Sequence, residues 1–268
     1  DKTGTLTKNE MTVTKIFDGF KTFEVTGSGY SPEGKFKLEG KEVDPLETNN
    51  LKQLLTAGAL CNNAYYGSHD EDYRVVGDPT EGCLLVAAAK AGLWYEDLKE
   101  SRKELNEFSF SSDRKRMSVV YKDEGVKKVF AKGAPKVMLD LCNRIKVNGK
   151  VKQLTAKKKK EILEQNESMA SSALRVLAIA VKDYEGKKVT EEKAESDLIF
   201  LGLVGMIDPP REEVAEAIKL TRQAGIRVII ITGDHELTAK AITKEIGLFS
   251  QGDVALTGEK VDEMSEHE

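Results

Sequence analysis

The last quarter of the sequence alternates between short apolar runs and amphipathic segments, and this alternation most constrains the fold. Residues 198–206 are apolar throughout, and residues 227–231 are apolar except for Arg227, which is typical of strands buried on both faces of a parallel sheet. Apolar residues at helical spacing predict helices over 211–224 and 237–246, each ending at a glycine. This order predicts a doubly wound α/β domain, whose sites lie beyond the carboxyl ends of its strands.

The middle of the chain, from about residue 16 to 197, has a different pattern. Residues 117–132 are expected to form a hairpin closed at 123–125, and residues 144–154 a hairpin around Asn148-Gly149. Polar segments with glycine are expected to be surface loops or edge hairpins, at 18–44 and 67–73. Helices are expected over 50–61, 80–91, 135–141 and 155–172.

These patterns predict two domains in a chain of 268 residues. Residues 1–12 and 197–268 are expected to form the doubly wound domain, incomplete at both ends. Residues 13–196 are expected to be an inserted α+β domain, an antiparallel sheet with flanking helices.

Composition excludes several classes of protein. The formal net charge is −4, so no global basic field is present to hold nucleic acid. The longest apolar runs have about six residues, far below the ~18 that cross a bilayer. The three cysteines are widely spaced, which is typical of a protein from a reducing cytosol. The chain opens at Asp1 without a methionine or a leader pattern, so we expect it to be a piece of a longer protein.

The sequence begins with DKTGTLT, a carboxylate followed by a turn rich in glycine and threonine. Such a turn can hold a phosphoryl group with its amides and hydroxyls while the carboxylate attacks it. An isolated Asp-Lys-Thr-Gly would more readily be interpreted as a polar turn. All seven residues together match the phosphorylation motif of the P-type ATPases, ion pumps that form an aspartyl phosphate, and the chain therefore resembles that family.

Two further segments match family motifs in the expected order, IDPPR at 207–211 and TGDH at 232–235. IDPPR alone would be an ordinary capped helix start, whereas TGD directly after an apolar run suits a phosphate. In the resembled fold, of haloacid-dehalogenase type, these residues flank the phosphorylated aspartate. The resemblance implies a catalytic set of Asp1, Lys2, Thr3, Asp208, Arg211, Thr232, Gly233 and Asp234.

The expected insertion resembles the nucleotide-binding domain of the same family. It carries GDPTE at 77–81, FSSDRKRM at 110–117, KGAP at 132–135 and ALRVLAIA at 173–180. An adenine needs an aromatic face and a nearby carboxylate, while a triphosphate needs cations. Phe110 and Met117 taken alone would read equally well as core residues. The resemblance implies nucleotide contacts from Asp78, Glu81, Phe110, Lys115, Met117, Lys132, Gly133 and Arg175.

The resemblance implies that the γ-phosphate of ATP passes to Asp1, with Mg²⁺ held at Asp1 and Thr3. The motifs are most similar to a bacterial-like, calcium-type branch, with sodium/potassium-type or other cation pumps as the alternative. The parent protein would lie in a membrane with this portion in the cytoplasm, and membrane helices absent from this chain would bind the cation.

A soluble haloacid-dehalogenase-type phosphatase is a second alternative. Such phosphatases carry an aspartate where Thr3 stands, and a threonine cannot replace it as an acid or base.

We expect the chain to bind adenine nucleotide without turning it over. The nucleotide contacts are all present, whereas the family's lysine and its GDGxND motif with magnesium ligands would follow beyond Glu268. Losing several positioning groups removes far more than the ~2.7–4 kcal/mol typical of one transition-state donor. Incubation with γ-labelled ATP and Mg²⁺, followed by acid quenching, should leave no label, and a hydroxylamine-labile label on Asp1 would contradict the expectation.

Overall fold

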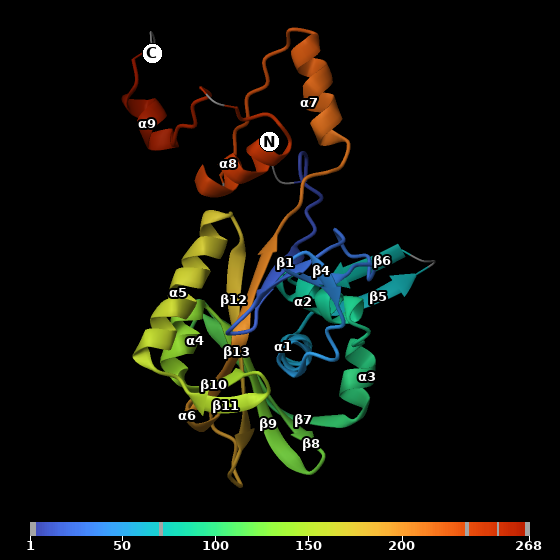
Figure 1. Cartoon of the computed structure of the whole chain (residues 1–268), viewed down its shortest axis with the longest axis vertical. Coiled ribbons are helices and arrows are strands. Elements are labelled where there is room, and N and C mark those ends of the chain that lie inside the picture. The colour runs from blue at the N-terminus through green and yellow to red at the C-terminus, as the bar shows by residue number, and fades with distance from the viewer. Residues whose placement is uncertain (1–3, 70–71, 234–235, 251, 266–268) are drawn as a thin grey trace.

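A computed structural model of the chain describes residues 4–69, 72–233, 236–250 and 252–265. In this part of the chain most strands belong to one sheet, which contains β1 (Thr12–Phe17), β2 (Thr22–Val25), β3 (Phe36–Leu38), β4 (Lys41–Val43), β7 (Arg102–Ser111), β8 (Arg116–Asp123), β9 (Val126–Gly133), β10 (Cys142–Val147), β11 (Lys150–Gln153), β12 (Arg175–Tyr184) and β13 (Leu198–Ile207). The hydrogen-bonded order is β4-β3-β2-β1-β13-β12-β9-β8-β7, and β10 joins β13 and β11 (Figure 1). Every pairing is antiparallel except β10 with β13.

Helices cover both faces of this sheet. On one face lie α1 (Asn49–Leu60), α2 (Pro79–Lys90) and α3 (Tyr95–Glu100), beside the separate hairpin of β5 (Tyr65–His69) and β6 (Asp72–Val76) (Figure 1). The other face carries α4 (Pro135–Leu141) and α5 (Ala156–Ser171). The short α6 (Glu191–Ala194) precedes β13. No helix in the described ranges is long and apolar enough to cross a bilayer.

The two larger hydrophobic cores lie on opposite faces of the sheet. Alternate residues of β12 serve both: Ile179 and Val181 pack in the core with α1 and α2, whereas Ala178 and Ala180 pack in the core with α4 and α5. Successive side chains of a strand point to opposite faces, so a strand with helices on both sides reads as a continuous apolar run. The run in ALRVLAIA therefore reflects burial on two faces.

The structure confirms both expected hairpins. Glu124 and Gly125 connect β8 to β9, and Asn148 and Gly149 connect β10 to β11; all four residues have φ between 48° and 86°. Two-residue turns with positive φ match the twist of the flanking strands, and glycine adopts them without steric cost. The six expected helices are also present, each within three residues of its expected ends. The polar segments 18–44 and 67–73 contribute edge strands and the β5–β6 hairpin.

The expected parallel sheet of the C-terminal quarter is not present in the described residues, and two expectations are corrected. Residues 198–206 do form a strand, β13, but it pairs antiparallel with β1 and β12. Residues 227–231 form no strand, since no described strand lies beside them to bind their backbone groups. The helices α7 (Val214–Gln223) and α8 (Glu236–Glu245) are present, followed by α9 (Gly258–Glu263).

Residues 227–231 nevertheless have one face that packs against other residues and one face that is exposed to solvent. Val228 and Ile230 contact a small apolar cluster formed by Leu6, α7 and the residues that follow α8, whereas Ile229 and Ile231 are 72% and 80% exposed. This alternation is what an extended segment shows when helices cover one side of it. The cluster also brings Leu6, near the start of the chain, to α7 and to the segment that follows α8 (Figure 1).

The position of β13 generates a prediction about the inserted domain. The inserted domain expected from the sequence, residues 13–196, does not include β13. In the structure, however, β13 lies between β1 and β12 and is almost wholly buried. We therefore expect residues 10–210 to unfold in one cooperative thermal transition followed by circular dichroism. Residues 13–196, which lack β13 and expose the edges of β1 and β12, should show no such transition; a cooperative transition there would contradict the prediction.

Candidate functional site

The site expected from the sequence centres on Lys132, near the end of β9. Lys132 is opposite Met117 in β8 and Ile179 in β12, so it lies in the middle of three neighbouring strands. Its side chain points toward the α1 and α2 face, where its Nζ lies 2.8 Å from Oε1 of Glu81. Lys132 is 5% exposed, which is rare for a lysine and requires a partner for its charge.

The ammonium group of Lys132 keeps donors that the described residues do not use. Its Nζ has no hydrogen-bond acceptor of good geometry in the described part of the chain, although the Glu81 carboxylate is close. An ammonium has three N–H donors, and leaving them unpaired in a buried place is costly. A bound anion or a polar ligand would satisfy them, so this geometry favours a ligand site.

The start of α2 places the two acidic residues of GDPTE. Asp78 is the N-cap of α2 and accepts a 2.7 Å hydrogen bond from the Thr80 amide, and Pro79 occupies the first turn. Three residues after the cap, Glu81 faces the sheet, where its Oε2 accepts a 3.0 Å bond from the Asn63 amide. Asp78 is therefore used in capping, and Glu81 forms the wall beside Lys132.

Phe110 and Met117, the two residues of FSSDRKRM that sequence alone left ambiguous, have opposite environments. The β7–β8 register shifts between Phe108 and Ser111, and Phe110 in this irregular stretch is 62% exposed. Met117 is 1% exposed and belongs to the core beneath the site. The ring of Phe110 is thus available to a ligand, whereas Met117 supports the site from below.

The registers bring Phe110 and Lys132 to the same end of the sheet. Ser111 is opposite Arg116, and Arg116 is opposite Gly133. Neighbouring strands lie ~4.8 Å apart, and two such spacings separate Ser111 on β7 from Gly133 on β9. The backbone beside Phe110 is therefore about 10 Å from the backbone beside Lys132. An aromatic face and a buried cation at this separation suit a ligand with a flat ring and a negative group.

The turn before β8 is held against the following loop. Lys115 has φ of 52°, its amide donates to Ser111 O, and its carbonyl accepts a 2.9 Å bond from the Ala134 amide. A Cβ on Gly133 would lie 2.6 Å from the Lys115 carbonyl oxygen, so only glycine allows this approach. Gly133 therefore contributes backbone packing, and the Lys115 side chain is exposed.

Arg175 links the sheet to the start of α2. It is exposed at the first position of β12, and its Nη1 donates a 2.7 Å hydrogen bond to Oγ1 of Thr80. This bond holds a guanidinium group at the first turn of α2.

Sequence reasoning missed Glu195, which holds the FSSDRKRM turn from behind. Its side chain is 2% exposed and accepts bonds from Nη1 of Arg114 at 2.9 Å, Nε of Arg116 at 2.5 Å and Oγ of Ser118 at 2.9 Å. Glu191 adds a second contact to Arg114 at 3.0 Å. Two arginines within a short motif are a signal that a carboxylate must lie elsewhere in the chain, but its position depends on the fold.

The cysteines near the site are not nucleophiles. Burial raises the pKa of the Cys61 and Cys83 thiols to about 12, and the nearby Lys132 offsets only part of this effect. Both side chains therefore stay protonated at neutral pH and pack as small apolar groups.

A second cluster forms where the start of the chain meets the end of β13. Oγ1 of Thr7 donates a 2.6 Å bond to Oδ2 of Asp208, and the Glu10 amide donates to Oδ1 at 3.2 Å. Arg211 donates to the carbonyl of Gly4 at 3.1 Å. Residues 4–10 and 208–211, two hundred positions apart, therefore lie side by side.

Four residues of the expected catalytic set, Asp1, Lys2, Thr3 and Asp234, lie outside the described residues. Thr232 is half-buried and Gly233 is exposed. The described residues contain no group of three or more histidine, cysteine or acidic side chains arranged for a metal ion.

The Glu195 cluster generates a stability prediction. Glu195→Ala leaves Arg114 and Arg116 without their shared carboxylate, and breaking a buried ion pair costs about 3 kcal/mol. We expect this loss in the free energy of unfolding measured with urea. Glu185→Ala, a change at an exposed glutamate in the same region, is the matched control and should cost less than about 0.5 kcal/mol. Equal effects from the two variants would contradict the structural role.

Comparisons with known proteins show which family the chain resembles. Residues 50–213 match the family described as "P-type ATPase, cytoplasmic domain N". The chain is 43% identical to a calcium-transporting ATPase of Bacillus subtilis, which it matches over its whole length and over 30% of that relative. It is 42% identical to calcium-transporting ATPase 1 of Lactococcus lactis and 37% identical to calcium-transporting ATPase type 2C member 1 of Bos taurus.

The chain spans less than a third of the length of these relatives: 30%, 28% and 26%. The family match contains most of the residues around Lys132, including Glu81, Phe110 and Arg175. Because it also covers more than half of the chain, this protein belongs to the P-type ATPase family and carries the family's cytoplasmic N domain.

Proposed function

We propose that this chain binds ATP at the Lys132 site and that, as the catalytic part of a whole membrane calcium pump, it presents the γ-phosphate to Asp1. The observation that carries the proposal is the buried ammonium of Lys132, which has unused donors beside Glu81 and an exposed aromatic ring at the same end of the sheet. The relatives' names, all calcium-transporting ATPases in the three cases above, favour calcium over sodium or potassium as the cation.

In this proposal adenine stacks on Phe110, and Lys132 donates to the nucleotide from below. Glu81 holds the ammonium in place and edges the pocket together with Asp78. Lys115 and Arg175 are exposed on either side of the buried lysine, where they can neutralise phosphate charge. Glu195 acts as a positioning residue, because it holds the arginines on both sides of Lys115.

Phosphoryl transfer would take place at the second cluster. Asp1 attacks the γ-phosphorus, the bond from this phosphorus to the bridging oxygen breaks, and ADP leaves. Mg²⁺, when bound, neutralises charge on the phosphoryl oxygens. Asp208 accepts bonds from Thr7 and the Glu10 amide and so orients the turn that follows the nucleophile, while Arg211 holds the carbonyl of Gly4.

A haloacid-dehalogenase-like fold for the C-terminal part belongs to the same proposal. Helix α7 and the residues after α8 cover one face of residues 227–231, and the alternating exposure of this segment is what an extended segment covered on one side would show. In the whole pump this part would face the cytoplasm, and membrane helices outside this chain would bind the cation.

The nucleotide site generates a paired binding test. Phe110→Ala should weaken the binding of a non-hydrolysable ATP analogue by about 1–3 kcal/mol, the range for base stacking on an aromatic ring. Lys132→Met should weaken it as well, because it removes the buried cation. Isothermal titration calorimetry measures both effects.

Two changes at exposed positions serve as controls, Phe20→Ala and Lys41→Met. Phe20 is 55% exposed in the turn between β1 and β2, and Lys41 is exposed at the edge strand β4. Wild-type affinity in Phe110→Ala and Lys132→Met would overturn the assignment of the site. An equal loss in the controls would show that the effect is not local and would overturn it too.

A further inference from the structure

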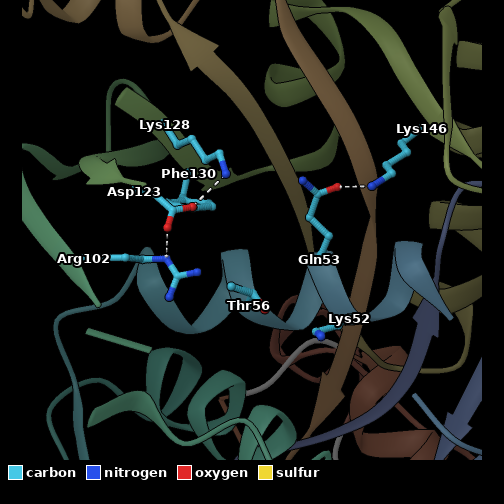
Figure 2. Close-up of a pocket in the computed structure, with 8 residues that line it drawn as sticks. All are labelled: Lys52, Gln53, Thr56, Arg102, Asp123, Lys128, Phe130 and Lys146. Atoms are coloured by element: carbon cyan, nitrogen blue, oxygen red, sulfur yellow. Dashed lines mark hydrogen bonds and ion pairs between the residues drawn. The ribbon is translucent and has the colours of Figure 1, made fainter. Parts of the chain in front are cut away.

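A second charged site lies at the opposite end of the strands that carry Lys132. A cavity of about 260 Å³ opens between α1 and the ends of β7, β8, β9 and β10 (Figure 2). Its charged lining residues are Lys52, Arg102, Asp123, Lys128 and Lys146. We call this space the basic cavity.

The basic cavity is strongly positive in a chain that is negative overall. Four cationic side chains line it against one carboxylate, an excess of three positive charges, whereas the formal charge of the whole chain is −4. Like charges gathered in one hollow repel each other, and low-dielectric walls strengthen the field inside it. A negative ligand would relieve this repulsion.

The side chains that contact these cations neutralise their charge only in part. Asp123, whose side chain is 8% exposed, is shared between Lys128 at 2.7 Å and Nε of Arg102 at 3.2 Å. The contact with Arg102 lacks hydrogen-bond geometry, so this buried Nε has no acceptor among the described residues. Lys146 donates its 2.7 Å bond to the neutral amide oxygen of Gln53, and burial lowers the pKa of Lys146. Each of these cations can gain from an additional negative partner.

The cations form two groups on opposite sides of the basic cavity. In Figure 2, Arg102, Asp123 and Lys128 lie on one side and Lys146 on the other, with Lys52 and Thr56 on α1 below them. The volume is below the ~300–1,000 Å³ of sites for drug-sized ligands. This space suits a small anion that is charged at both ends.

The basic cavity is separate from the proposed nucleotide site. Lys128 and Lys132 are four residues apart on β9, about 13 Å along an extended strand. Phe130 lies between them on the same face and is 3% exposed, so its ring is part of the core that divides the two places. A ligand in one place therefore does not contact a ligand in the other.

We propose that the basic cavity is a second anion site, which binds a small ligand with two phosphoryl groups, of the pyrophosphate type. The guanidinium of Arg102 and the ammonium of Lys128 bind one phosphoryl group, and Lys146 and Lys52 bind the other. The hydroxyl of Thr56 adds a donor on the α1 side.

The test uses inorganic pyrophosphate and the whole chain, without Mg²⁺ and at constant ionic strength. Amide NMR spectra recorded during the titration should show saturable shifts at Gln53, Thr56 and Phe130. These shifts should persist when a non-hydrolysable ATP analogue is bound. Shifts confined to Glu81, Lys132 and Arg175 would mean that pyrophosphate occupies the nucleotide site, and would overturn the proposal.

Charge-removing variants make the test specific. Lys52→Gln, at an exposed position that the fold does not depend on, should weaken pyrophosphate binding about tenfold, and Lys52→Gln with Lys146→Gln should weaken it further. Lys41→Gln with Lys150→Gln removes two exposed lysines elsewhere and should leave the affinity unchanged. Equal weakening by the two double variants, or shifts that never saturate, would show non-specific attraction to positive charge and overturn the proposal. The affinity for the ATP analogue should be unaltered in all these variants. A loss of pyrophosphate binding alone can then be distinguished from an error in the assignment of the nucleotide site.

Discussion

The antiparallel pairing of β1 with β13 is the interaction on which the rest of the molecule depends. The chain leaves this pair at Phe17, forms the remaining strands and their helices, and returns to it at Leu198. The register, with Thr12 opposite Ile207, places residues 4–10 beside residues 208–211. Two motifs that are separated by two hundred residues therefore meet because two strands pair.

The same sheet carries the residues of the nucleotide site in register. From β13 outward, β12 supplies Arg175, β9 supplies Lys132, β8 supplies Met117 and β7 supplies Phe110. The site needs no loop to bring these groups together, since the spacing between strands sets their separation. A site built on strands also holds its side chains more precisely than one built on loops.

Buried charge is used in pairs throughout this sheet. Glu81 accompanies Lys132, and Glu195 accompanies Arg114 and Arg116, so each buried group has a partner of opposite sign. Lys132 and Arg102 differ from the other cations, since each has a buried nitrogen without an acceptor among the described residues. These two nitrogens lie at opposite ends of the strands, and each marks a place where the charges of the protein alone are incompletely satisfied.

The sequence by itself determined the local elements and the identity of the motifs. The turns at Glu124-Gly125 and Asn148-Gly149 and the start of α2 at Asp78-Pro79 depend on φ preferences and on hydrogen bonds between near neighbours, which are encoded locally. Seven consecutive residues of DKTGTLT were enough to predict the family, because a long motif carries chemistry that few other sequences share.

Only the tertiary structure decided which strands pair and which side chains are exposed. An apolar run such as residues 198–206 indicates burial on two faces, but it does not distinguish a parallel from an antiparallel partner. Residues 227–231 have the same pattern and form no strand, since a strand exists only when another strand binds its backbone. The exposure of Phe110, the burial of Met117 and the role of Glu195 follow from contacts between distant segments, and periodicity along the chain does not record these contacts.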